Sequence, residues 1–423
     1  MGILKSPLLG AWIVILSGVV VALQIGKLPP ALPALQAQMG VTWLQAGFLL
    51  SMVQFAGMAL GLVVGLFADR WGLRLCMLCG LVALSVASFL GGLASAPEAL
   101  LWLRGMEGFG FLLASLPAPA LIRQLVPPDK LNAMMGLWGA YMPAGTALAL
   151  LVGPLWIPIW GWPSWWWLFA GLSALMALGL LVAVPADSVR RSSVSTERAN
   201  ASSDIRYSLG QRIHETLRAP GPWLVSLTFA MYSGQWLAVV GFLPSIYAQA
   251  GLSGAWLGVL TALAAAVNMV GNVASGRFLQ KGVSAGVLLY CGFLAMALGG
   301  ALAFGAWTSD LPIWRYAGVL LFSMCGGLVP GTLFSLALRL APSEGTVAAT
   351  VGWMQQWSSA GQFVGPPAVA WLAAQVGGWQ WTWTITGACC VVGMLLSWRM
   401  AVVMQLSEPH LPNKLTASSS ATP

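Results

Sequence analysis

The sequence predicts an all-α membrane protein with twelve transmembrane helices in two six-helix bundles, and composition is the first reason. Of the 423 residues only 7% are charged, whereas 58% are hydrophobic, and the mean hydropathy is +0.82. A soluble globular protein carries about 25% charged residues. A chain this poor in charge cannot cover a water-facing surface of ordinary composition. The composition therefore excludes a soluble enzyme, a nucleic-acid-binding protein and a disordered chain.

The second reason is a series of long apolar runs, which are separated by glycine, proline or charged residues. A membrane-spanning helix needs about 20 predominantly apolar residues. The first run follows Lys5 as the apolar part of a signal peptide would, but it is too long and another run follows at once, so we expect a retained helix. The twelve expected spans are residues 10–33, 42–67, 74–95, 99–122, 132–157, 164–184, 222–246, 253–278, 284–307, 313–338, 346–373 and 380–404.

A polar, serine-rich segment at residues 185–221 divides these runs into two groups of six. The groups resemble each other, because Pro33 and Gly40 after the first span recur as Pro244 and Gly251 after the seventh. A parallel repeat of this kind is typical of transporters that bind their solute between two halves at mid-membrane. The four expected parts are an N-terminal bundle (1–184), a cytoplasmic linker (185–221), a C-terminal bundle (222–404) and a cytoplasmic tail (405–423).

Basic residues fall almost entirely on one side of this topology. Cytoplasmic loops of membrane proteins carry an excess of Lys and Arg. With the N-terminus inside, the outer loops hold only Arg315, at a helix end where its side chain can reach the interface. We therefore expect a multi-pass protein of the cytoplasmic (inner) membrane with both termini in the cytoplasm. The inner basic residues are Lys5, Arg70, Arg74, Arg123, Lys130, Arg190, Arg191, Arg198, Arg206, Arg212, Arg218, Arg277, Lys281, Arg339, Arg399 and Lys414.

The most specific motif lies in the inner loop between the second and third spans, where the sequence reads Gly65-Leu-Phe-Ala-Asp69-Arg70-Trp-Gly72-Leu-Arg74. Gly65 allows close helix packing, Gly72 permits a tight turn, and Asp69 can accept hydrogen bonds from an arginine or a helix N-terminus. The motif resembles the signature of the major facilitator superfamily, although the residue before Arg74 is not basic here. The resemblance implies that these five residues form a charge latch that holds one conformation of a transport cycle.

The resemblance extends over residues 10–404 and implies a secondary transporter rather than an enzyme. The partners it implies are a small-molecule solute, protons as the coupling ion and the lipid bilayer, without nucleic acid, and we expect a monomer. No cofactor and no metal are expected. The cysteines, which include the pair Cys76 and Cys79, lie in apolar runs and are interpreted as packing residues, and His214 and His410 lie outside the spans.

Three charged residues fall within or beside spans, where a central charge costs about 2.5–3.5 kcal/mol on insertion scales. Arg104 and Glu107 stand at i and i+3 on one face of the fourth span. Glu107 is the candidate for proton coupling, and the alternative is a structural pair with Arg104. Lys27 is either a cation of the binding cavity or an anchor at the interface. Together they leave one net positive charge, which favours an anion.

Lys27 also carries a weaker resemblance, because a basic residue before proline at this place is similar to the cyanate-permease branch of the superfamily. Uncharged side chains in the spans are further candidates for the cavity wall, and the alternative for each is a contact between helices. The tryptophans near span ends, such as Trp160 and Trp165–Trp167, predict an interfacial belt. The candidates for solute binding are Lys27, Arg104, Tyr141, Tyr232, Gln235, Gln355 and Gln356.

These observations predict a transporter that works by alternating access and takes up a small anionic or polar solute, cyanate-like or a small organic anion, by symport with protons. The alternative is a proton-driven efflux antiporter for amphipathic drugs or metabolites, which needs an aromatic, acid-lined cavity. A non-transporting membrane sensor is a third possibility. It would need a soluble output domain, for which residues 185–221 and 405–423 are too short.

Overall fold

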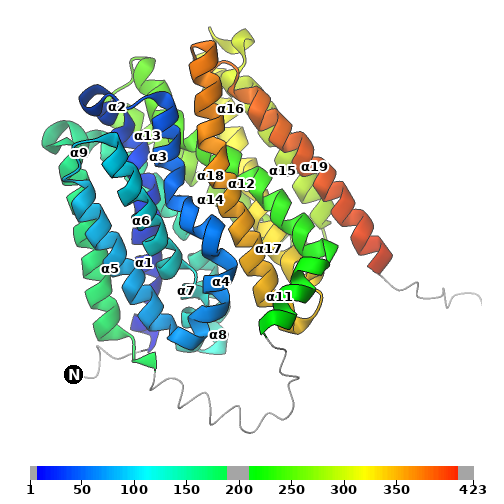
Figure 1. Ribbon diagram of the computed structural model, residues 1–423. Coiled ribbons are helices and arrows are strands. Elements are labelled where there is room, and N and C mark those ends of the chain that lie inside the picture. Colours follow the sequence, from blue (N-terminus) through cyan, green and yellow to red (C-terminus); the bar gives the residue numbers. More distant parts are fainter. Residues whose placement is uncertain (1–6, 188–208, 408–423) are drawn as a thin grey trace, which may run out of the picture.

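The computed structural model describes residues 7–187 and 209–407, apart from the side chains of residues 65–70 and of a few single positions, and this part of the chain contains helices and no strands (Figure 1). Three short 3-10 turns, η2 (Met52–Gln54), η3 (Ala306–Thr308) and η4 (Glu344–Thr346), connect longer elements. The α-helices are α1 (Pro7–Gly26), α2 (Leu28–Met39), α3 (Trp43–Ser51), α4 (Phe55–Trp71), α5 (Leu73–Gly91), α6 (Pro97–Ser115), α7 (Ala118–Leu125), α8 (Pro128–Gly139), α9 (Tyr141–Ala183), α11 (Leu209–Arg218), α12 (Pro220–Gln249), α13 (Gly254–Ala266), α14 (Asn268–Gln280), α15 (Ala285–Phe304), α16 (Pro312–Gly326), α17 (Leu328–Leu340), α18 (Val347–Val376) and α19 (Thr382–Ser407).

Within the described residues, ten helical segments are long and apolar enough to cross a membrane. Two further crossings bring the total to the predicted twelve. α9 extends over 43 residues but is kinked at Gly161, where φ is 76°, a conformation that glycine adopts most readily. Residues on both sides of the kink pack against the first crossing, so α9 runs past it twice. Before the kink, Gly153 packs on Pro30 of α2, and after the kink, Ala183 packs on Gly10 of α1. The other crossing is α18, which has 30 residues.

The first crossing is interrupted at Lys27, which lies between α1 and α2. Two consecutive prolines follow the break, and proline has no N–H to donate to the helical ladder. Side chains from other helices donate to backbone carbonyls near the break. Arg104 Nη1 donates to the Gln24 carbonyl at 2.8 Å, and Trp165 Nε1 donates to the Lys27 carbonyl at 3.0 Å. Such partners are what allows a broken helix at membrane depth.

The two halves of the molecule, α1–α9 and α12–α19, repeat one packing pattern. A Cβ atom at Gly80 would lie 2.6 Å from the Gly110 carbonyl oxygen, so α5 and α6 are in backbone contact. A Cβ atom at Gly299 would likewise lie 2.6 Å from the Gly318 carbonyl oxygen, between α15 and α16. Small residues at such places let membrane helices approach closely. The same contact therefore recurs at equivalent positions, as a repeated fold requires.

The two halves are in direct contact through glycine positions. A Cβ atom at Gly47 of α3 would lie 2.8 Å from the Pro367 Cα atom of α18. A Cβ atom at Gly258 of α13 would lie 2.7 Å from the Leu151 carbonyl oxygen of α9. Because backbone meets backbone at both places, the halves cannot separate without breaking these contacts.

Candidate functional site

The three intramembrane charges predicted from the sequence meet in one cluster inside the first half. Lys27 Nζ lies 2.5 Å from Glu107 Oε1, and Arg104 Nη1 lies 2.6 Å from Glu107 Oε2. All three side chains have no solvent exposure. Lys27 therefore does not reach the interface in this conformation, and the interpretation of Lys27 as a snorkelling anchor is wrong. Each carboxylate oxygen of Glu107 faces one basic group, so the cluster carries one net positive charge when Lys27 is protonated.

Three neutral side chains complete the cluster. Lys27 Nζ also donates to Gln24 Oε1 at 2.7 Å and to Ser88 Oγ at 2.6 Å. Ser88 Oγ lies 2.8 Å from Gln24 Oε1 and 3.0 Å from Glu107 Oε1. Gln24 Nε2 donates to Ser173 Oγ at 2.9 Å. We call Gln24, Lys27, Ser88, Arg104, Glu107 and Ser173 the buried polar network.

Different helices bring these residues together. Two i, i+3 spacings, that of Arg104 with Glu107 and that of Gln24 with Lys27, are the parts visible in short stretches of sequence. Gln24 lies on α1, Ser88 on α5 and Ser173 on α9. Gln24 stands three residues before Lys27, so the helical period of α1 was the one signal that could have identified it. No such signal exists for Ser88, because its contact with Lys27 joins α5 to the break after α1.

Arg104 has one nitrogen without a partner. Its Nε donates to the Leu49 carbonyl at 3.2 Å, and its Nη1 donates to Gln24 and Glu107. Its Nη2 is buried and makes no hydrogen bond. An unsatisfied donor on a buried charged group is costly. This nitrogen is therefore a place where an acceptor, such as an anionic solute, would be stabilised.

Two tryptophans of α9 form a wall of the network. The Lys27 Nζ atom lies 4.9 Å from the centroid of the Trp166 ring, within range of a cation–π interaction. Trp165 is 1% exposed and Trp166 is not exposed at all. The prediction that these two belong to an interfacial belt is therefore wrong, whereas Trp160 at the kink is 58% exposed.

An apolar layer lies beside the network, where the two halves meet. Ile25 of α1, Val53 of η2 and Leu237 of α12 are buried together, and Phe111 and Met142 pack against them. Phe111 lies one helical turn after Glu107 on α6. The side chains of this layer are apolar, and they join the first half to the second at this level.

Polar contacts between the halves run along α18. Gln54 Nε2 donates to Gln362 Oε1 at 3.0 Å, and Ser359 Oγ donates to Gln54 Oε1 at 3.3 Å. Gln356, a predicted solute-binding residue, donates from Nε2 to the Met58 carbonyl at 2.8 Å and accepts from the Leu62 N–H at 2.9 Å. Its neighbour Gln355 is half-buried. In this conformation the side chain of Gln356 is thus bound to α4 rather than directed at a solute.

The second half contains a polar cluster without formal charges. The Tyr232 hydroxyl and the Asn268 side chain are hydrogen-bonded at 3.0 Å, and Asn268 Nδ2 also donates to the Ser323 carbonyl at 2.8 Å. The Trp236 Nε1 donates to Ser323 Oγ at 3.1 Å. Tyr232 is therefore held among neutral groups of its own half. Tyr141, the matching candidate in the first half, stacks on Trp138 with ring centroids 4.3 Å apart.

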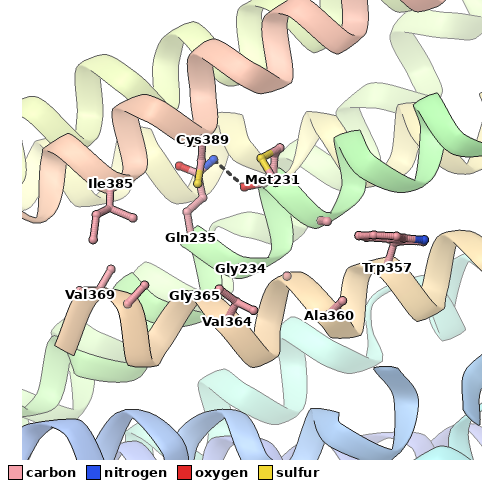
Figure 2. A pocket seen from close by; sticks show the side chains of 13 residues that line it. Met231, Gly234, Gln235, Trp357, Ala360, Val364, Gly365, Val369, Ile385 and Cys389 are labelled. Carbon is pink, nitrogen blue, oxygen red and sulfur yellow. Dashed lines mark hydrogen bonds between the residues drawn. The ribbon is translucent and has the colours of Figure 1, made fainter. Parts of the chain in front are cut away.

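Gln235 lies in a groove that belongs to the second half alone. Figure 2 shows it between α12, α18 and α19, with the Gln235 amide bonded to the Met231 carbonyl. The cavity has a volume of about 240 Å³ and a nearly apolar lining that includes Trp357 and Cys389. Val364 at its rim is 61% exposed, so the groove opens at the outer surface of the bundle. The structure therefore does not bring Gln235 together with the predicted cations.

The expected latch is described only in part. Three of its five residues, Gly65, Asp69 and Arg70, fall in residues 65–70, whose side chains lie outside the described part of the structure. Gly72 has φ 112°, and a Cβ atom there would lie 2.5 Å from Asp187 Oδ2. The Asp187 carboxylate accepts from the Arg74 and Leu75 N–H groups at 3.2 and 3.1 Å, at the N-terminus of α5.

Comparisons with known proteins give a consistent family. A sequence profile described as the Major Facilitator Superfamily matches residues 14–361. The chain is 23% identical to the cyanate transport protein CynX of Escherichia coli (strain K12) over 398 residues, which covers 88% of this chain and 92% of that protein. It is 26% identical to the multidrug transporter MdfA of Edwardsiella ictaluri (strain 93-146), covering 71% and 72%.

Two further comparisons bear on length and fold. The chain is 30% identical to the tetracenomycin C resistance and export protein of Streptomyces glaucescens, but it spans only 34% of that protein's length. The crystal structure of the D-xylose-proton symporter has the same fold, with a TM-score of 0.72 at 16% identity, and the match covers 94% of this chain and 98% of that one.

Proposed function

The chain belongs to the Major Facilitator Superfamily and is a multi-pass membrane transporter, not an enzyme, and from this premise we propose that it takes up a small monovalent anion together with protons. We propose further that the solute is handed across the membrane by alternating access of the two halves. In this proposal the protein lies in the cytoplasmic membrane with both termini in the cytoplasm, as the distribution of basic residues favours.

The net charge of the buried polar network is the observation that carries the proposal. Two cations face a single carboxylate, and all three groups are buried. With Lys27 protonated, the network has an unbalanced charge, which is costly inside a membrane protein and is retained where it serves a function. A bound anion would remove this imbalance, and the free Arg104 Nη2 supplies a donor for it. Arginine and lysine together are well suited to recognise a small anion.

Alternating access explains how a closed network can bind a solute. The network has no exposure in this conformation, so the anion must enter in another one. Rocking of one half against the other opens the space between the halves to each side in turn, and in this proposal the anion reaches the network of the first half from that space. The relatives support a small solute, since one of them is named for cyanate transport and another is a putative niacin/nicotinamide transporter of Bacillus subtilis.

Uptake into proteoliposomes tests the proposal. Cyanate, formate and nicotinate would be supplied outside at pH 6, with pH 7.5 inside, and compared with the uncharged nicotinamide. We expect uptake of at least one of the anions that depends on the pH gradient and is lost in Arg104→Ala. The matched control is Arg315→Ala, which removes an arginine outside the network. Failure to transport any anion, with correctly folded protein, would reject the proposal.

A second candidate is export of amphipathic compounds, and the apolar layer of Ile25, Val53 and Leu237 favours it. A solute that passes between the halves at this level meets these apolar side chains. Several relatives are named for drug resistance or multidrug transport. Thermal stabilisation of the detergent-solubilised protein separates the candidates. Hydrophobic cations that stabilise wild type and the Arg104→Ala variant equally would favour export.

A further inference from the structure

We propose that Lys27, rather than Glu107, is the group that carries the proton, and that one proton accompanies each monovalent anion. This inference rests on the proposed anion uptake and adds the identity of the coupling residue and the stoichiometry.

Glu107 is held in the ionised form by its surroundings. Its two oxygens lie 2.5 Å from Lys27 Nζ and 2.6 Å from Arg104 Nη1, and Ser88 Oγ lies 3.0 Å from the first oxygen. Charge-assisted contacts of this length strongly favour the carboxylate over the carboxylic acid. Arginine does not lose its proton in proteins. Of the three charged groups, lysine is therefore the one left to exchange a proton with solvent.

The hydrogen bonds around Lys27 fit both of its protonation states. A charged amine has three N–H donors, and three acceptors are in place: Gln24 Oε1, Ser88 Oγ and Glu107 Oε1. A neutral amine has two donors and a lone pair. The Ser88 hydroxyl can then rotate and donate to this lone pair, because a hydroxyl both donates and accepts. Ser88 therefore keeps the amine satisfied whether or not the proton is present.

Among the described residues, Arg104 and Glu107 are the charged groups that interact with Lys27. The groups that face it are Arg104 and Glu107 from α6, Ser88 from α5, Gln24 from α1 and the Trp166 ring from α9. Gln24 is fixed in turn by Ser173 of α9. Lys27 is thus the residue of this network that can gain or lose a proton.

Charge balance then links the proton to the solute. With Lys27 neutral and no anion, Arg104 and Glu107 cancel. With Lys27 charged and a monovalent anion bound, the four charges cancel again. Loading one without the other leaves a net charge in a site that is sealed from water, which is strongly unfavourable. The two balanced states correspond to an empty carrier and to a carrier loaded with one proton and one anion.

The decisive variant is Lys27→Arg, because arginine stays charged at every physiological pH. In proteoliposomes, wild type is expected to accumulate the anion and to take up one proton per anion, which a pH-sensitive dye measures. This uptake is expected not to depend on a clamped membrane potential. Lys27→Arg is expected to keep anion-for-anion exchange, in which the carrier crosses in both directions with an anion bound. Its net uptake and its proton uptake are expected to fall by about tenfold or more, because the empty carrier cannot discharge.

A second variant covers the case in which arginine does not fit. Ser88→Ala removes the donor for the neutral amine and is expected to slow net uptake while exchange persists. Ser85→Ala is the matched control on the same helix, since its hydroxyl bonds to the Ala170 carbonyl and not to the network. Net, proton-coupled uptake that survives Lys27→Arg would overturn the proposal and return the role to Glu107. If wild type moves no anion at all, the proposed function fails first.

Discussion

Gln356 on α18 accepts a hydrogen bond 2.9 Å long from the backbone N–H of Leu62 on α4, and so links the second half of the molecule to the first. The other end of the same amide donates to the Met58 carbonyl at 2.8 Å. The Leu62 N–H and the Met58 carbonyl are one turn apart, the pair that an uninterrupted α-helix joins to each other. One side chain of α18 thus engages the backbone of α4 at both groups.

Removing this side chain is expected to loosen the closed interface. In Gln356→Leu, the two backbone groups of α4 can still bond to each other, so the folded halves remain intact while this link between them is lost. We expect faster deuterium uptake in peptides that cover α4, measured by mass spectrometry of the detergent-solubilised protein. The matched control is Gln355→Leu at the next position. Equal uptake in both variants would mean that Gln356 does not hold the halves together.

Glu107→Gln is expected to destabilise the protein strongly. The change leaves Lys27 and Arg104 facing each other without a counter-charge, and breaking a buried ion pair in this way typically costs about 3–5 kcal/mol. Thermal unfolding in detergent at constant pH measures the loss. The double variant Lys27→Met with Glu107→Gln removes one cation as well and should regain part of the stability. If the double variant is less stable than both single ones, the pair does not carry the effect.

The sequence was sufficient for the crossings and for the identity of the charged residues, but not for their surroundings. Arg104 and Glu107 could be paired because residues three positions apart on a helix share a face. Ser88 and Ser173 could not be found, since their contacts join helices that are distant in the chain. Trp166 was misassigned because proximity to a span end does not reveal whether a ring faces lipid or the bundle interior.

The break after α1 is a second feature that the sequence could not fully predict. Prolines after Lys27 were visible in the sequence, and they left open whether the helix ended at the membrane surface or continued beyond it. In the structure α2 continues for 12 residues, and Lys27 lies in the interior of the crossing. The choice depends on whether other helices supply partners for the broken backbone, which Arg104 and Trp165 do. That information lies in the packing, not in the local pattern.

Close packing of α12 on α18 gives a steric prediction. A Cβ atom at Gly361 would overlap the Ala230 carbonyl, and the atoms it meets there all belong to the backbone, so no side chain can rotate to make room. Gly361→Val should therefore force the two helices apart and cost about 1–3 kcal/mol or more. The control is Gly387→Val on α19, where a Cβ atom meets nothing within 4 Å. The melting temperature in detergent is the measurement, and equal losses at both positions would point to valine's helix propensity instead.

Gly72 and Gly282 occupy the two loops that correspond in the repeat, and alanine at each gives the last prediction. Both have positive φ, 112° and 86°, so alanine is strained at either place. Only at Gly72 would the new Cβ atom also lie 2.5 Å from Asp187 Oδ2, whereas at Gly282 it meets nothing within 4 Å. Gly72→Ala should therefore displace the carboxylate that accepts from the first N–H groups of α5 and lower the melting temperature more than Gly282→Ala does. Adding Asp187→Ala to Gly72→Ala removes the overlap, so its further cost should be smaller than that of Asp187→Ala in wild type; full additivity of the two losses would show that the carboxylate and the glycine act independently.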